Sequence, residues 1–567
     1  MTDPISGCVS LLLACLAPQE PGDHWLDLPT AKATLLGEAR AIPARRWSFG
    51  DQPGASVEAG SGDLPWVFGL AIESDRLAPW LTLAGQGAEL RIEELPPSDG
   101  LRLIGDATQF PSAHAAVSAL AAVVQRPLEL EIRAWRFAVA PDSPRIRYAP
   151  SELLALTESA TPLGRALTVT RAHEFAVFGE RRETPFIGDV QIEFGPGDLP
   201  LAAPRIEQIR EGLTATLLAL PCGDDDGIVL LGEFAFAALR GVLAPMPTGV
   251  VGQPDLETGE LEEFVATVAG RVGDGESLAF WSLGDAREGP TVLVVLTPRW
   301  RTARPVLPRD VELIGAAALR VSQLDRRLDD ADELGPAWRR EGAPRHGDAE
   351  PRSSVPPGPH RTSDAASVEL FALATAALEG EAGADALVLG PWLAVRAGEA
   401  ARARVRAALE PLVELRTATR ALELVASAEG GGTIHRVLVP VRDDQRVSLR
   451  RGVLRRAIVD FSVERSGASA VLDPIAASCF TGLVARVQGA TALAGVQVRA
   501  SVAMAAREAI ATRVSSAPCR IDATVTSLAR HFAELVVPGP GAVALGAGAE
   551  LVRDGVRSTT QLSLALR

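Results

Sequence analysis

The chain has 567 residues, 47% of them hydrophobic, and a formal net charge of −15 at pH 7. The length predicts several domains, and the hydrophobic fraction is ample for globular folding. The negative charge argues against a nucleic-acid partner and against an anionic membrane surface, because both kinds of binding depend on Lys and Arg.

Simple residue patterns exclude several kinds of site. Lys32 is the only lysine and is followed by Ala33, so the sequence has no phosphate-binding Gly-Lys-Ser/Thr loop. The five cysteines form no C-x-x-C pair, and the seven histidines form no H-E-x-x-H or H-x-H pattern. We therefore predict no catalytic residue, no cofactor site and no metal site, and we interpret the chain as a non-enzymatic protein.

The first 22 residues are predicted to be a leader. Leu-Leu-Ala-Cys, ending at Cys15, resembles a bacterial lipobox, which makes Cys15 the candidate lipidation site and the leader a candidate membrane tether. No Lys or Arg precedes Cys15, whereas an export signal has a basic start, so a simple hydrophobic leader strand stays open as the alternative. No run of about 20 apolar residues occurs, and no transmembrane helix is predicted.

Two kinds of domain follow the leader. Residues 23–137 end in a strand, Leu101–Gly105, a helix, His114–Gln125, and a second strand, Leu128–Phe137, an order that predicts a small βαβ-type module. Residues 138–321 alternate apolar and polar residues between Gly, Pro and Asp turns, a pattern typical of antiparallel β-structure.

The same order then recurs. Residues 322–367 are charged and rich in Pro and Ser, which predicts a flexible linker. Residues 368–429 contain a second α/β module with a helix over Ala400–Leu415, and residues 430–567 a second β-rich domain. The predicted fold class is α+β: a duplicated unit of a small βαβ-type module followed by an antiparallel β-rich domain.

Short stretches of the two β-rich domains support the duplication. The first reads FIGDVQIEF around Asp189 and the second AIVDFSVER around Asp460. In both copies a proline follows the aspartate at a similar distance, and a glycine follows eight residues after that proline. The repeat-equivalent structural positions are Asp189, Pro204 and Gly212 in the first copy and Asp460, Pro474 and Gly482 in the second.

Two sets of residues are candidates for binding. Asp189 and Glu193 are four residues apart and share one face of a strand, as do Asp460 and Glu464, but we interpret both pairs as polar faces directed to water. The nine tryptophans are interpreted as core residues, with a carbohydrate or peptide surface that uses Trp66 and Trp80 as the alternative.

The edges of the β-rich domains are the remaining question that the sequence raises. Antiparallel sheets need protection of their outermost strands. The two copies can pack edge to edge, or each can meet another subunit, and the sequence leaves both arrangements open.

Three stretches resemble bacterial secretins, the outer-membrane gate proteins of type II and type III secretion and pilus systems. Gly100–Trp135 is similar to the passage from the family's last periplasmic module into its β domain. Ala386–Ala428 follows the same plan. Val272–Gly275 with Leu283-Gly284 is similar to the family's D-G-x-x-x-x-L-G-G strand pair. On these motifs the chain is identified as a secretin-like protein with two tandem copies.

The resemblance implies modules without a gate. The family's closing segment, of the type V-P-x-L-G-x-I-P-x-x-G-x-L-F, has no match, and long membrane hairpins are not evident. The resemblance implies a structural or assembly component linked to protein secretion, in the periplasm or at the outer membrane, with protein partners or self-association. Three alternatives stay open: a monomeric periplasmic binding module, an enzyme of unknown type, and a cytoplasmic location.

Overall fold

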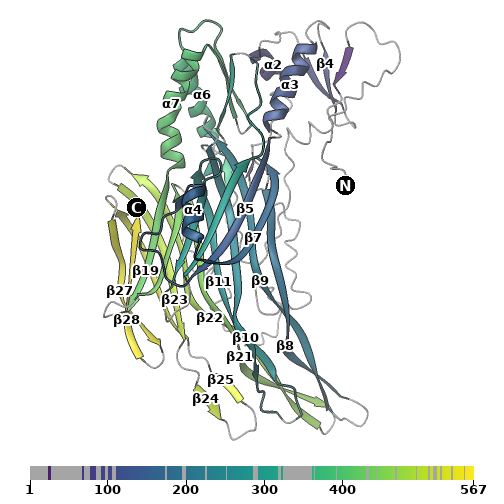
Figure 1. Cartoon of the computed structure of the whole chain (residues 1–567), viewed down its shortest axis with the longest axis vertical. Coiled ribbons are helices and arrows are strands. Elements are labelled where there is room, and N and C mark those ends of the chain that lie inside the picture. Colours follow the sequence, from purple (N-terminus) through teal and green to yellow (C-terminus); the bar gives the residue numbers. More distant parts are fainter. Residues whose placement is uncertain are drawn as a thin grey trace.

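The computed structural model describes most of the chain from residue 110 onward and shorter pieces before it (Figure 1). The described residues are 23–26, 67–68, 77–84, 91–95, 100–104, 110–124, 126–172, 175–194, 200–223, 227–250, 252–284, 291–308, 310–316, 319, 321–322, 360–362, 364–390, 392–428, 433–443, 445–466, 469–492, 495–507, 511–514, 520–523, 526–537, 541–553 and 556–566. The predicted leader with Cys15, and residues 323–359 of the predicted linker, lie outside them.

An eight-stranded antiparallel sheet forms one layer of the protein, in the order β26-β23-β22-β21-β11-β10-β9-β8. Its strands are β8 (Phe175–Phe194), β9 (Pro200–Cys222), β10 (Gly227–Met246), β11 (Leu256–Val272), β21 (Arg446–Ser466), β22 (Ser469–Ala492), β23 (Gly495–Arg507) and β26 (Thr526–Val537). A separate short hairpin joins β23 to β26 and consists of β24 (Ala511–Val514) and β25 (Arg520–Ala523).

A nine-stranded sheet forms the second layer, in the order β27-β28-β19-β20-β12-β13-β5-β7, with β6 also paired to β12. Its strands are β5 (Pro127–Phe137), β6 (Arg147–Tyr148), β7 (Thr161–Arg171), β12 (Ser277–Leu283), β13 (Thr291–Trp300), β19 (Thr419–Ala428), β20 (Thr433–Arg442), β27 (Gly541–Arg553) and β28 (Val556–Leu566). The helix α4 (Pro150–Thr157) lies between β6 and β7 in the chain.

The main core lies between these two sheets. Alternate residues of β5, from Leu128 through Ile132, are buried there, as the two-residue period of a strand requires. The Phe234 ring of the eight-stranded sheet meets the Phe280 ring of the nine-stranded sheet edge-on, with centroids 4.9 Å apart. The predicted antiparallel β-structure of residues 138–321 is therefore present as two packed layers.

Each sheet consists of two halves with the same strand order. In the eight-stranded sheet, β8-β9-β10-β11 is followed by β21-β22-β23-β26, and β11 pairs with β21 from Glu260↔Arg455 to Ala266↔Leu449. In the nine-stranded sheet, β7-β5-β13-β12 is followed by β20-β19-β28-β27, and β12 pairs with β20 at Trp281↔Leu438. Strands from residues 127–300 and from residues 419–566 thus stand side by side in both layers.

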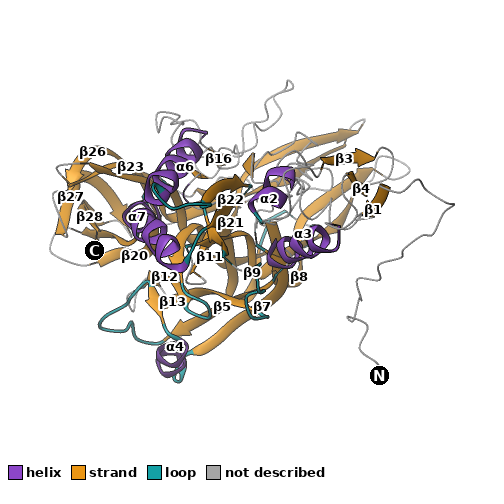
Figure 2. Cartoon of the chain, turned by 90° about the horizontal axis from the view of Figure 1, so that it is seen from above, coloured by secondary structure: helices purple, strands orange, loops and turns teal. Residues whose placement is uncertain are grey.

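Two helix-containing modules lie at one end of the sheets (Figures 1 and 2). Each has a three-stranded antiparallel sheet, in the orders β1-β4-β3 and β14-β18-β17. The elements of the first are β1 (Asp23–Leu26), α2 (Leu77–Leu83), β3 (Arg91–Leu95), β4 (Gly100–Ile104) and α3 (Phe110–Val124). Those of the second are β14 (Val311–Gly315), α6 (Asp364–Leu378), β17 (Asp385–Leu389), β18 (Trp392–Arg396) and α7 (Glu399–Thr417). A small sheet joins β2 (Val67–Phe68), β15 (Val321–Ser322) and β16 (His360–Thr362).

The modules differ from the predicted βαβ arrangement. The strands on either side of α3 are β4 and β5, and they belong to different sheets; the same holds for β18 and β19 on either side of α7. In the second module, the apolar stripe of α7, formed by Ala401, Val405, Leu409 and Val413, recurs every four residues and packs in one cluster with β18 and with the ends of β9 and β10. The chain then leaves the module for the larger sheet.

None of the helices in the described part of the chain has the length and apolar composition needed to cross a membrane.

Long hairpins extend from the sheets at the end opposite the helices (Figure 1). The pairing of β9 with β10 ends at Gly212↔Ala237, whereas β8 and β9 continue together to Phe194↔Pro200. Likewise, β22 leaves β23 at Gly482↔Ala505, whereas β21 and β22 continue to Ser466↔Ser469. We call residues 181–194 with 200–212 distal hairpin 1, and residues 452–466 with 469–482 distal hairpin 2. The sequence analysis did not predict hairpins of this length.

Glycine is required at both branch points. Gly212 has φ +126° and Gly482 has φ +149°, values that other residues rarely adopt. A Cβ atom at Gly212 would lie 2.1 Å from the Glu180 carbonyl oxygen, and one at Gly482 would lie 2.2 Å from that of Arg451. Both glycines therefore allow neighbouring strands to approach where a hairpin leaves its sheet.

Candidate functional site

A set of charged residues lies where the two halves of the eight-stranded sheet meet. Glu262 and Glu263 are on β11, and Arg450 and Arg451 are on β21; we call these four residues the charged seam. Glu262 pairs in register with Val453, and Phe264 pairs with Arg451, so Glu262 and Arg451 are diagonal neighbours on the same face. Glu263 and Arg450 are related in the same way on the opposite face.

Glu262 is the centre of the seam and is fully buried. Its Oε1 atom accepts hydrogen bonds from Arg451 Nη2 at 2.6 Å and from Arg240 Nη2 at 3.4 Å. Its Oε2 atom accepts a longer bond, of 3.5 Å, from Arg136 Nη2 on β5. Arg451 in turn donates through Nε to the hydroxyl of Ser282 on β12. The network therefore joins both halves and both layers.

The opposite face of the seam carries a second ion pair. Arg450 Nη2 lies 3.1 Å from Glu263 Oε2, and the Glu263 side chain is only 2% exposed. The Arg450 guanidinium also stacks over the Phe480 ring of β22, 4.4 Å from its centroid. Both faces of the β11–β21 pairing are thus fixed by oppositely charged side chains.

The energetic role of the seam follows from its burial. Removing one partner of a buried ion pair is strongly destabilising, because the other charge is left without compensation. A slip of one residue between β11 and β21 would move Glu262 and Arg451 to opposite faces of the sheet. The seam therefore specifies both the partner and the register of the junction between the halves.

The junction in the nine-stranded sheet is apolar by comparison. Trp281 of β12 is fully buried, pairs with Leu438 of β20, and donates through Nε1 to the Arg145 carbonyl oxygen at 2.9 Å. The Phe137 ring lies 5.4 Å from it, between centroids. Arg436, two residues from Leu438, forms a 2.5 Å bond through Nε to Glu423 Oε1 within its own half.

The repeat-equivalent positions lie at matching places in the two distal hairpins. A register shift separates Ile187 from Asp189 in β8, and a corresponding shift separates Ile458 from Asp460 in β21. Pro204 pairs with the residue after Asp189, and Pro474 pairs with the residue after Asp460. With the branch-point glycines, these residues occupy backbone features of the hairpins.

Among the described side chains, Asp189 and Glu193 do not act as a pair and Trp80 belongs to the core, whereas the side chains of Asp460, Trp25 and Trp66 lie outside them. Asp189 lies 3.8 Å from Arg205 Nη1, whereas the exposed Glu193 accepts a 3.0 Å hydrogen bond from Gln191, so the two carboxylates have separate partners. Trp80 is buried in α2 and donates through Nε1 to the Ala116 carbonyl oxygen at 3.2 Å, which makes it a core residue. Trp25 lies in β1.

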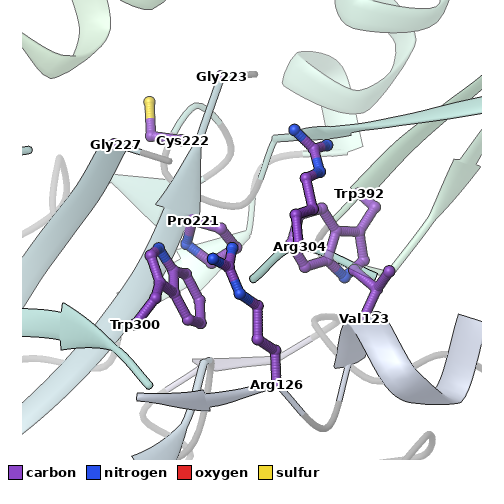
Figure 3. A pocket seen from close by; sticks show the side chains of 9 residues that line it. All are labelled: Val123, Arg126, Pro221, Cys222, Gly223, Gly227, Trp300, Arg304 and Trp392. Carbon is purple, nitrogen blue, oxygen red and sulfur yellow. The ribbon is translucent and has the colours of Figure 1, made fainter. Parts of the chain in front are cut away.

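A hollow lies between the two modules and the ends of the sheets (Figure 3). Its empty volume is about 340 Å³, a value that includes space open to solvent. Arg126 stacks over the Trp300 ring at 4.2 Å and donates through Nε to the Thr302 carbonyl oxygen at 2.9 Å. Trp392 is buried at the rim. The Arg126 side chain therefore fixes the start of β5 to the end of β13.

The sequence reading missed the charged seam. Its residues stand in Leu-Glu-Glu-Phe, from Leu261 to Phe264, and in Leu-Arg-Arg-Gly, from Leu449 to Gly452. Two adjacent acids inside one apolar strand and two adjacent arginines inside another are a complementary pattern. That pattern could have identified the two strands as neighbours.

The turn that carries part of the secretin resemblance links the two layers. Gly275, with φ +75°, follows Asp274 between β11 and β12, and its N–H donates to the Pro298 carbonyl oxygen at 2.8 Å. Asp274 Oδ1 accepts a 2.7 Å hydrogen bond from the backbone N–H of Trp300. This Asp-Gly pair therefore fixes the crossing from the eight-stranded to the nine-stranded sheet.

No protein-family model and no curated protein matches the sequence. Solved secretins are among the structures that match. One is the Salmonella type III secretion injectisome secretin InvG in its open gate state, at 14% identity over 52% of this chain and 88% of that one, with a TM-score of 0.20. The type IV competence pilus secretin PilQ of V. cholerae matches at 10% identity over 37% and 69%, with a TM-score of 0.18. The type II secretion secretin GspD of E. coli matches at 10% identity over 40% and 60%, with a TM-score of 0.19.

Proposed function

We propose that the chain is a non-enzymatic structural or assembly component of the bacterial cell envelope, built from two secretin-like units in tandem and linked to protein secretion. The proposal rests on the strand order and side chains of this chain, together with the sequence motifs given above. Under this proposal, each unit consists of one module and one half of each sheet, and the two units derive from a duplication.

The observation that carries the proposal is the edge-to-edge junction. The second half continues the first in both layers, through β11–β21 and β12–β20. A junction of this kind converts a sheet edge into a continuous sheet, which is the contact that assembles β-rich subunits into larger structures. One chain therefore contains one example of the backbone pairing that the proposed assembly would repeat.

The outermost strands support self-association. Among the described residues, β8, β26, β7 and β27 each pair on one side only. Leu167 and Val169 of β7 are 47% and 46% exposed. When β5 is aligned with its equivalent β19, Leu167 corresponds to Arg436 of β20 and Val169 corresponds to Leu438. Leu438 is buried at the junction with β12. The free edge thus presents apolar side chains where the internal junction buries one.

The test is the mass of the purified full chain, by light scattering coupled to size exclusion, with negative-stain imaging of each fraction. The proposal predicts large symmetric oligomers in which every chain contributes two adjacent sheet units. A single-chain mass at all accessible concentrations would contradict assembly by this chain alone. It would leave a binding module, the alternative of the sequence reading, as the better account.

A further inference from the structure

The two distal hairpins contact one another, although they come from different halves of the chain. Arg456 of β21 forms an ion pair with Glu207 of β9, and its guanidinium lies 5.5 Å from the centroid of the Phe186 ring of β8. Phe186 belongs to one buried cluster with Phe480 of β22. Distal hairpin 1 therefore packs on distal hairpin 2 over an apolar and ionic surface.

The contact continues toward the tips of the hairpins. Val190 of β8 and Ile458 of β21 are buried together in a second cluster. The tip of the β10–β11 hairpin closes the same region, because Glu257 Oε2 accepts a 2.7 Å hydrogen bond from the Ile187 N–H, and Gln253 Nε2 donates to the Leu472 carbonyl oxygen at 2.5 Å. Three hairpins thus meet at this end of the molecule.

Carboxyl groups from both hairpins lie within this contact. Asp473 of β22 is half-buried, and its Oδ1 atom is enclosed without a hydrogen-bond partner. Asp189 of β8 and Glu464 of β21 act on it electrostatically, and the Ser462 hydroxyl donates a hydrogen bond to it.

The charged groups around Asp189 are mixed. Burial has the largest effect and raises the pKa of Asp189. The hydrogen bond from the Val190 N–H and the charges of Arg456 and Arg205 lower it, whereas Glu207 of β9 raises it. The arginines therefore compensate Asp189 in part.

We propose that the contact between the distal hairpins is a proton-dependent clasp, closed while Asp473 is protonated and weakened when Asp473 loses its proton beside Asp189 and Glu464. Distal hairpin 1 would move about Gly212, where β9 leaves β10. Release would uncover Phe186 and Val190 on one hairpin and Phe480 and Ile458 on the other. The clasp is a property of the single chain and does not depend on assembly.

The direction of the pH effect follows from the two states. Burial, followed by the charges of Asp189 and Glu464, raises the pKa of Asp473 to about 6, from 3.8. Release removes Asp189 and the burial against distal hairpin 1 but leaves Glu464 on the same hairpin as Asp473, so the released form binds fewer protons than the closed form below about pH 6. Closure therefore weakens as pH rises from about 4 to about 6 and does not change further above that. The closed-to-open ratio should fall by less than the roughly hundredfold change that loss of the whole shift would give.

The test is a distance measurement between spin labels on the two hairpins of the full chain. Ala203→Cys and Val463→Cys place labels at exposed positions, in a background whose five native cysteines are replaced by Ser. The expected result is a single short distance at pH 4 and a longer one whose population increases up to about pH 6. Distributions that are identical at pH 4 and pH 7.5 would overturn the proposal.

Two substitutions identify the responsible group. Asp473→Asn should keep the short distance at both pH values, whereas Asp385→Asn, the same change on β17 of the second module, should behave like the parent chain. Asp189→Asn provides an independent variant. Because it removes the neighbouring charge, the population with the longer distance should be smaller than in the parent chain. If Asp473→Asn opens with the same pH dependence as the parent chain, Asp473 is not the group that controls the clasp. Because the labels report on one chain, a monomeric result would disprove the proposed assembly without affecting the clasp.

Discussion

The internal junction of the eight-stranded sheet and the free edges of the same sheet carry different side chains at equivalent positions. Gly212 pairs with Arg181 and Ala237, and Gly482 pairs with Gly452 and Ala505, which aligns the two halves. In this alignment, the residue of β26 equivalent to Glu262 of β11 is Ser527, and the residue of β8 equivalent to Arg451 of β21 is Glu180.

The comparison separates two kinds of contact that share one backbone pattern. At the internal junction, buried opposite charges fix the partner and the register. At the free edges the same ion pair cannot form, because serine and glutamate stand in place of glutamate and arginine. The internal junction is therefore the permanent contact, and any contact through the free edges depends on backbone pairing and apolar side chains, as on β7.

Loss of Glu262 is the change expected to have the largest effect. Glu262→Ala leaves Arg451 buried without its main partner, which should lower the free energy of unfolding by about 3–5 kcal/mol. The matched control is Glu180→Ala at the free edge, where the side chain is exposed and the loss should stay within about 1 kcal/mol. Urea unfolding of both variants measures the difference, and equal losses would contradict the distinction between junction and edge.

The branch-point glycines should show the next largest effect, and it should be the same in both halves. Gly212→Ala and Gly482→Ala each force a Cβ against a neighbouring carbonyl oxygen at positive φ, and each should cost about 2–3 kcal/mol of unfolding free energy. Gly241→Ala is the control, with φ +75° and nothing within 4 Å of the added atom, and should cost about 1 kcal/mol. A large effect in one half only would show that the halves are not equivalent there.

The second ion pair of the seam can be isolated by a double-mutant cycle. Glu263 and Arg450 should show a coupling free energy of about 1–3 kcal/mol, because Glu263 is buried. The exposed pair Glu381 and Arg404, at 3.2 Å, should give less than about 0.5 kcal/mol. Chemical unfolding of the single and double alanine variants gives both values. A seam coupling no larger than the surface coupling would show that the seam does not hold the halves together.

The smallest effect on the fold is expected from a charge placed on the free edge. Val169→Lys on β7 should leave the unfolding free energy within about 0.5 kcal/mol but abolish association of chains, because lysine on an edge strand opposes pairing. Val139→Lys changes an exposed valine outside the strands in the same way and should leave association intact. Light scattering measures the mass of both variants in solution. If Val169→Lys associates like the parent chain, β7 is not part of the contact between chains.

Local structure was the part of the fold that could be predicted. The helices α3 and α7 lie within a few residues of the predicted ranges, because apolar periodicity and the Pro and Gly residues at their ends are local signals. The glycines at positions 212 and 482 and their neighbouring aspartates and prolines were identified by their spacing.

Strand pairing could not be derived in the same way. The pairing of β11 with β21 joins residues almost 200 positions apart, and alternation alone does not select the partner. The predicted βαβ pairing was wrong for a related reason, because the order strand-helix-strand does not state whether both strands enter one sheet. The sequence analysis did not single out the seam residues, because burial of Glu262 exists only once the two sheets are packed.

The most direct test of the central claim is to cut the folded chain between residues 323 and 359 and ask whether the halves stay together. A specific protease site inserted there would allow cleavage after folding, followed by size exclusion under native conditions. The account predicts that the two fragments of the parent chain co-elute in equal amounts, and that fragments carrying Glu262→Ala separate at a lower urea concentration than the parent fragments when size exclusion is repeated in increasing urea. Separation of the parent fragments into two independent folded species would contradict a junction fixed by the charged seam.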